Sequence, residues 1–217
     1  MQNYPFTLSQ VRPIRDAMTI SRPAGLGRKV PVTWFSLGAD TSITPEYYDC
    51  TTLYLGGEGS GEFILGEEGR EVPVHPGQLL YVPPKMLCGS KTDSGMIYSE
   101  IILKKENFTM NSIIKAGQPT ELKNLISYEE GSIANLDIVH ADNMKFVLMA
   151  FDEGTGLTPH RAPGNAILTA LEGKAIIGYE GKDYELNAGE SFRFDKNGLH
   201  SVTAQGKFKM SLLLVIE

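Results

Sequence analysis

The sequence has few of the residues that form disulfides or bind metals, with 2 cysteines and 4 histidines among 217 residues. Cys50 and Cys88 lie too far apart for a disulfide framework, and in a reducing compartment both are expected to be free thiols. Long apolar runs are also absent, since stretches such as residues 146–151 and 212–216 are far short of a membrane span. The first ten residues lack the basic-then-apolar pattern of a signal peptide, so we expect a soluble, cytoplasmic protein without a membrane partner.

An excess of basic residues is lacking too, because the formal net charge is −6. This balance argues against a nucleic-acid partner, and no helix-turn-helix pattern is present that could read DNA. Only the first 29 residues are locally basic, with five Lys and Arg residues against Asp16. We expect this N-terminal arm, residues 1–30, to pack through Phe6 and Ile14 across the rest of the protein or a neighbouring subunit.

What the sequence does contain is an internal repeat. The segment GEFILGEEGREVPVHPGQ, residues 61–78, aligns without a gap to GKAIIGYEGKDYELNAGE, residues 173–190. The offset of 112 positions continues downstream, where it places Ser99 opposite Ser211. A duplicated unit of roughly 110 residues, present only twice, does not make a solenoid, so we expect each copy to be a domain.

The repeat also relates the segments upstream. There the offset is 114, so SITPEYY at residues 42–48 lies against GLTPHRA at residues 156–162. A two-residue insertion in GGEGSG, residues 56–61, explains the change of offset. With the downstream offset, Cys88 is placed opposite His200.

Both copies have the short alternating apolar runs of antiparallel β-structure, separated by Gly, Pro, Asn and Asp. The Glu-Gly pairs at 68–69 and 180–181 are predicted hairpin tips. Between the copies, TELKNLIS at residues 120–127 predicts a short helix capped by Thr120. Its apolar residues, expected to face inward, are Leu122, Leu125 and Ile126.

In the second copy Gly154 is followed after five residues by His160, and Gly189 is followed eleven positions later by His200. Together with Gly173, this spacing resembles the two sequence motifs of the cupin family. The first copy keeps the skeleton of the second motif, with Cys88 at the histidine position. The other residues of that skeleton are Gly77 and Pro83.

The resemblance covers nearly the whole chain and implies an all-β protein of two tandem cupin-like jelly-roll β-barrels, with any ligand-binding residues on inward faces. We expect an N-terminal arm over residues 1–30, an N-terminal barrel over 31–105, a linker with the short helix over 106–130, and a C-terminal barrel over 131–217.

The resemblance also implies a metal site of three histidines and a carboxylate, of which the second copy keeps His160 and His200. Ala162 and Ala166 stand at the positions of the missing histidine and glutamate. A divalent transition metal (Fe, Mn, Ni or Zn) in the C-terminal barrel therefore remains open, with water, substrate or a third side chain completing the sphere. Two further side chains could act as donors, Asn165 and His140. Asn165 lies at an odd offset from His160, so its side chain should point outward from the strand.

No metal is expected in the N-terminal barrel, where the repeat brings Glu46, Tyr48, Thr52 and Cys88 to the four ligand positions. Cys50 is an even number of residues from Glu46, Tyr48 and Thr52, so its side chain could point to the same face of the strand and approach Cys88. Buried cysteines nevertheless more often act as small apolar residues. His75 lies in a turn and is expected to be exposed.

Two functions follow as hypotheses. The first is binding of a small polar metabolite at His160 and His200 in the C-terminal barrel. The alternative is a metal-dependent cupin enzyme (a dioxygenase, isomerase or lyase) that uses the same two histidines plus water. The loss of a histidine and the carboxylate favours binding. The expected partner is a small-molecule ligand. The oligomeric state is open between a monomer and a homodimer.

Overall fold

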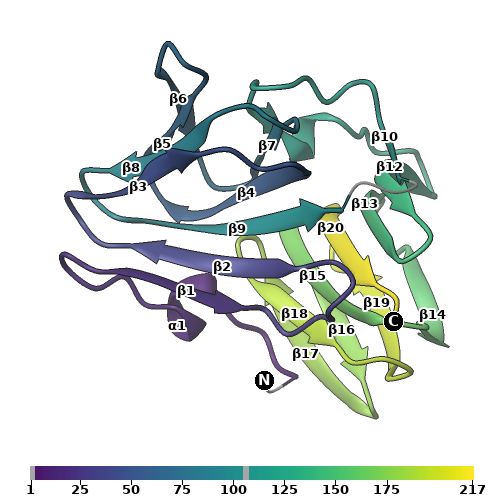
Figure 1. Ribbon diagram of the computed structural model, residues 1–217. Coiled ribbons are helices and arrows are strands. Elements are labelled where there is room, and N and C mark those ends of the chain that lie inside the picture. Colours follow the sequence, from purple (N-terminus) through teal and green to yellow (C-terminus); the bar gives the residue numbers. More distant parts are fainter. Residues whose placement is uncertain (1–2, 105–107) are drawn as a thin grey trace.

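A computed structural model describes residues 3–104 and 108–217, and β-strands make up nearly all of its regular structure (Figure 1). The strands form two six-stranded and two four-stranded sheets. One sheet of each size belongs to each copy of the repeat, so the protein consists of two tandem jelly-roll barrels, as the resemblance implies. No helix of the described residues is both long and apolar enough to cross a membrane. The predicted boundary at residues 105 and 106 lies outside the described residues.

The N-terminal barrel is a six-stranded sheet facing a four-stranded sheet. Its strands are β1 (Thr19–Pro23), β2 (Val32–Leu37), β3 (Thr41–Glu46), β4 (Thr51–Gly59), β5 (Gly61–Leu65), β6 (Arg70–Val74), β7 (Gln78–Val82), β8 (Cys88–Thr92), β9 (Met96–Leu103) and β11 (Thr120–Glu121). The larger sheet has the order β1-β2-β9-β4-β7-β11 and the smaller one β3-β8-β5-β6.

The C-terminal barrel repeats this plan. Its strands are β10 (Phe108–Met110), β12 (Ile133–Ala141), β13 (Met144–Phe151), β14 (Gly156–Arg161), β15 (Asn165–Glu172), β16 (Lys174–Tyr179), β17 (Lys182–Asn187), β18 (Ser191–Phe194), β19 (Leu199–Ala204) and β20 (Phe208–Val215). The larger sheet has the order β10-β12-β13-β20-β15-β18 and the smaller one β14-β19-β16-β17. The shared core order, β2-β9-β4-β7 against β13-β20-β15-β18, confirms the duplication.

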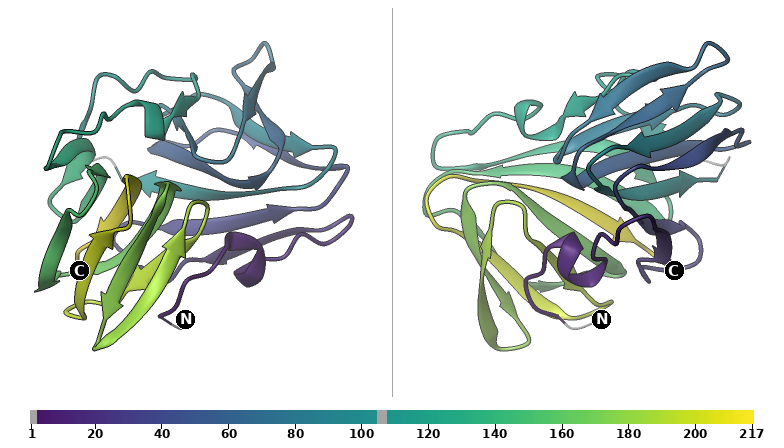
Figure 2. Two further views of the ribbon diagram at one scale, coloured as in Figure 1. Left: turned by 180° about the vertical axis from the view of Figure 1, so that it is seen from behind. Right: turned by 90° about the vertical axis from the view of Figure 1, so that its left-hand side faces the viewer.

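Three apolar cores hold this arrangement together. One fills each barrel, and a third lies between the two six-stranded sheets, where the barrels pack against each other (Figure 2). Trp34 of β2 and Phe146 of β13 belong to this third core, and each is 1% exposed. The strands of each six-stranded sheet therefore do not alternate between apolar and polar side chains, because both faces of the sheet are buried.

The predicted hairpins are present. Glu180 and Gly181 connect β16 to β17 with φ of 47° and 80°, as a two-residue turn with left-handed residues requires. Residues 66–69 connect β5 to β6.

The helix predicted over residues 120–127 is reduced to the 3-10 turn η1 (Leu122–Asn124). The backbone of Thr120 and Glu121 pairs with β7 instead, so these two residues are extended and no α-helix can begin there. Leu122 and Ile126 are nevertheless buried, as predicted.

The N-terminal arm is more ordered than expected. It contains a short helix, α1 (Leu8–Val11), and contributes β1 to the N-terminal barrel. Phe6 is buried and its backbone bonds to Ser191 of the C-terminal barrel, whereas Ile14 is exposed. The arm therefore joins the two barrels through one of its two predicted anchors.

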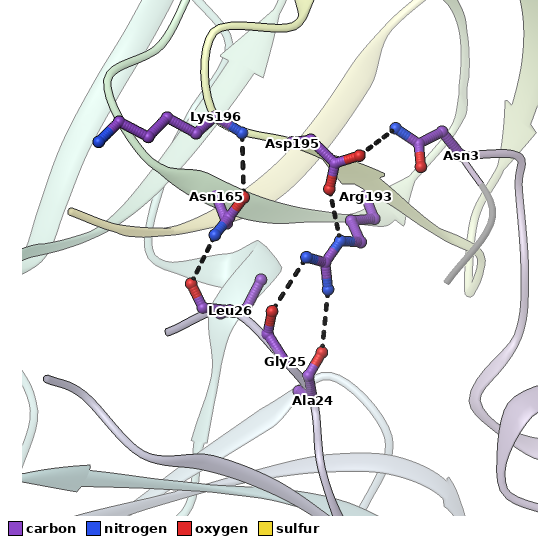
Figure 3. A network of polar contacts seen from close by, with 8 residues as sticks. All are labelled: Asn3, Ala24, Gly25, Leu26, Asn165, Arg193, Asp195 and Lys196. Carbon is purple, nitrogen blue, oxygen red and sulfur yellow. Dashed lines mark hydrogen bonds and ion pairs between the residues drawn. The ribbon is translucent and has the colours of Figure 1, made fainter. Parts of the chain in front are cut away.

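A polar network strengthens this connection (Figure 3). The guanidinium of Arg193 donates to the carbonyls of Ala24 at 3.1 Å and Gly25 at 2.9 Å, and to the carboxylate of Asp195 at 2.9 Å. Burial alone would raise the pKa of Asp195, but hydrogen bonds from Asn3 and Arg193 lower it below its usual value. The network fixes the segment before β2 on the edge strand β18.

Candidate functional site

The predicted histidines lie side by side at one end of the C-terminal barrel. His160 on β14 and His200 on β19 are direct cross-strand partners, and their ring centroids are 4.3 Å apart. His200 is buried and stacks on Phe194 at 4.2 Å, whereas His160 is exposed. The structure thus brings together the two residues that the sequence singled out.

A register shift in β14 places His160. The pairing of β14 with β19 is irregular between Leu157 and His160, and the pairing of β3 with β8 is irregular between Ile43 and Glu46. These positions correspond in the repeat, so both barrels carry the same distortion at the same point. A bulge of this kind changes which side chains a strand directs to one face.

Hydrogen bonds fix the tautomer of both imidazoles. Nδ1 of His160 lies 2.8 Å from the carbonyl oxygen of Thr158, and Nδ1 of His200 lies 2.9 Å from that of Gly198. A carbonyl oxygen can only accept, so each Nδ1 carries the proton and donates it. In the neutral ring Nε2 then has a free lone pair and is an acceptor or a metal ligand.

The environment keeps His200 neutral. Burial lowers its pKa, and the nearby His160 lowers it further, while the hydrogen bond to Gly198 acts in the opposite direction. A neutral imidazole is the form that accepts hydrogen bonds and coordinates metals through Nε2.

The complete metal site of the resemblance does not fit these residues. Ala162 and Ala166 supply methyl groups where donors are needed, and the described residues contain no group of three or more His, Cys, Asp or Glu side chains suited to a metal. Asn165 is committed elsewhere, since it donates to Leu26 and accepts from the backbone of Lys196. His140 is exposed on β12, in the other sheet.

The interior of this barrel is filled by its own side chains. Tyr179, Phe192 and Phe194 pack on one another with ring centroids 5.2 to 5.9 Å apart. They belong to the buried core of the barrel. A ligand of the histidine pair therefore has to approach from the solvent side, where His160 is exposed.

In the N-terminal barrel, Glu46 and Cys88 are cross-strand partners, as the repeat predicts. Burial raises the pKa of Cys88 to about 12, so this cysteine is a neutral thiol and a poor metal ligand. Cys50 is half-buried, and both cysteines are free. His75 is exposed, as expected.

Sequence reasoning missed Glu100, an acid buried in the same barrel. It lies opposite Tyr54 across β4 and β9 and is 8% exposed. Burial raises its pKa, against the effect of a hydrogen bond with Tyr54. The signal was an acidic residue within the apolar strand segment SEIIL, at the position where the second copy has Leu212.

The chain resembles known proteins in sequence and in fold. The family model of the cupin domain matches residues 147–216. A "Cupin 2 conserved barrel domain protein" from Leptotrichia buccalis is similar in structure with a TM-score of 0.86 and 25% identity, over 99% of this chain and 98% of that one. A salicylate 1,2-dioxygenase from Pseudaminobacter salicylatoxidans shares the fold at a TM-score of 0.69 and 13% identity, over 99% and 84% of the two chains. No curated protein matches the sequence.

Proposed function

Because this chain has the two-barrel cupin fold, we propose that it binds a small polar metabolite at the end of its C-terminal barrel where His160 is exposed, through His160 and His200. The observation that carries the proposal is the orientation of the two imidazoles, whose Nδ1 atoms both donate to carbonyls. Two adjacent Nε2 atoms then accept hydrogen bonds. The matching ligand presents neighbouring donors, such as the vicinal hydroxyl groups of a sugar or polyol.

A metal-dependent enzyme is the second candidate. The same Nε2 atoms would hold a divalent transition ion, and such an ion would act as a Lewis acid for a substrate that shares its sphere with water. The dioxygenase among the structural neighbours is consistent with this alternative at the level of the fold alone. Binding without a metal is favoured here, because Ala162 and Ala166 leave an ion with two protein ligands.

The test combines elemental analysis with thermal-shift screening of sugars, polyols and organic acids. We expect little bound metal in protein purified without chelator, and a rise in melting temperature with one class of ligand. His160→Ala and His200→Ala should abolish this rise, whereas His75→Ala, an exposed histidine outside the site, should retain it. About one metal per chain, lost in both site variants, would instead establish the metalloenzyme alternative.

A further inference from the structure

A cavity of about 180 Å³ lies between the two barrels, away from the histidine pair. The two six-stranded sheets form its walls, with Trp34 and Ile101 on one side and Phe146 and Leu213 on the other. Leu8 of α1 also lines it, so the N-terminal arm covers part of the cavity. Lys123, whose side chain is 45% exposed, lines it as well, which places an opening to solvent there.

The internal duplication builds this cavity from both copies. Ser99 and Ser211, which correspond in the repeat, both line it, although they come from opposite barrels. Further corresponding pairs that line it are Val32 and Phe146, Leu55 and Thr169, Gly57 and Leu171, Gly77 and Gly189, and Ile101 and Leu213. The cavity therefore lies where the two copies meet as equivalents, rather than at a random packing defect.

The lining is mostly apolar, with a few hydroxyl groups and the charged side chains of Glu58, Glu121 and Lys123. Ser99 is 6% exposed and Ser211 is 2% exposed, so both are shielded from bulk water while they line the cavity. Thr169 and Ser191 bond to each other through their hydroxyls at 2.9 Å. Glu58 accepts from the backbone of Ser9, and Lys123 lies 3.9 Å from Glu121, so these charged groups already have partners. Ser99 and Ser211 are the hydroxyl groups left to fix the polar end of a bound molecule.

We propose that this cavity is a second binding site, for a small single-ring compound that carries one hydroxyl group. An apolar cavity of about 150 Å³ in a protein is large enough for benzene, so the size fits one ring. The apolar walls around Trp34 and Phe146 take the ring, and Ser99 or Ser211 hydrogen-bonds to its hydroxyl group. This site goes beyond the proposed function, because it shares none of its residues with the histidine pair.

The single tryptophan of the chain, Trp34, lines the cavity and therefore reports directly on its occupancy. Phenol is the probe, with benzene as the ring without a hydroxyl group, and the fluorescence of the full chain is titrated with each. We expect a saturable change with phenol. Ser99→Ala or Ser211→Ala should weaken phenol binding by about fivefold, as the loss of one hydrogen bond does, without weakening benzene.

Two controls separate this site from the rest of the protein. The exposed Ser127→Ala and the His160→Ala variant should bind phenol like the parent. Failure of the proposed function would leave these titrations unchanged. The inference is overturned by a fluorescence change that does not saturate, by equal phenol affinity in the parent and both serine variants, or by loss of binding in His160→Ala.

Discussion

At the scale of single residues, the two barrels differ in which polar groups they bury. The C-terminal barrel buries a neutral imidazole that is fixed by a backbone carbonyl. The N-terminal barrel buries the carboxyl group of Glu100 and the hydroxyl group of Thr52, and burial disfavours the charged form of the first. Such groups reduce stability unless they are fully hydrogen-bonded, so they can be tested by substitution.

Glu100→Gln should stabilise the protein by about 1 kcal/mol at neutral pH. The folded-state pKa of Glu100 is raised, so the parent has its full stability below the unfolded-state pKa and loses part of it as pH rises through the folded-state pKa. Glutamine removes this loss and keeps an acceptor for Tyr54. Urea unfolding should therefore show a gain at pH 7 that shrinks near about pH 4.

The exposed Glu130→Gln serves as the control and should show no comparable dependence on pH. An equal difference between Glu100→Gln and the parent at both pH values would contradict the assignment of a raised pKa.

Thr52→Val should also stabilise the protein, by about 1 kcal/mol, because the buried Thr52 hydroxyl has no hydrogen-bond partner among the described residues. Valine has nearly the same shape and requires no partner. Thr41→Val is the matched control, since the Thr41 hydroxyl donates to the carbonyl of Gly38 at 2.7 Å and its removal should destabilise. Urea midpoints of the two variants should shift in opposite directions, and a shift in the same direction would argue for a partner of Thr52.

At the scale of elements, local patterns predicted what local interactions decide. The hairpin at residues 180–181 was predicted because its turn chemistry lies within two residues. The helix predicted over residues 120–127 was wrong, because a distant strand, β7, pairs with Thr120 and Glu121 and overrides their helical pattern. The role of β1 was missed for the same reason, since nothing near Thr19–Pro23 indicates its pairing with β2.

Arg193→Lys should weaken the attachment of the segment before β2 to the C-terminal barrel. The guanidinium makes three hydrogen bonds in fixed directions, and an ammonium group cannot reproduce this planar arrangement. We expect a loss of about 1 to 3 kcal/mol in thermal or urea unfolding. The exposed Arg161→Lys should change stability much less, and equal effects of the two substitutions would contradict a structural role of the network.

At the scale of the whole molecule, the core between the large sheets makes the two barrels one folding unit. Trp34→Ala should cost about 3 to 5 kcal/mol, because it empties a fully buried site in this shared core. Calorimetry should show a single unfolding transition in both the parent and the variant. Two separate transitions would mean that the barrels unfold independently.

A homodimer and a cytoplasmic location remain predictions.

The candidate site could be predicted only in part. The spacing of motifs identified His160 and His200, because these residues lie at fixed distances from turn glycines. Their tautomers could not be predicted, since these depend on carbonyls placed by the fold. The cavity between the barrels was also beyond sequence reasoning, because it exists only after the two copies pack together.

Binding at the histidine pair requires that both imidazoles carry their proton on Nδ1 and leave Nε2 free to accept. Long-range proton–nitrogen NMR of histidine-labelled protein at neutral pH measures this directly. We predict that His160 and His200 both give the pattern of a ring protonated at Nδ1 alone, and that a bound polyol perturbs their Nε2 signals. Neutral rings protonated at Nε2, or a doubly protonated His200, would contradict this binding mode, because neither form could accept a ligand's hydrogen bond there.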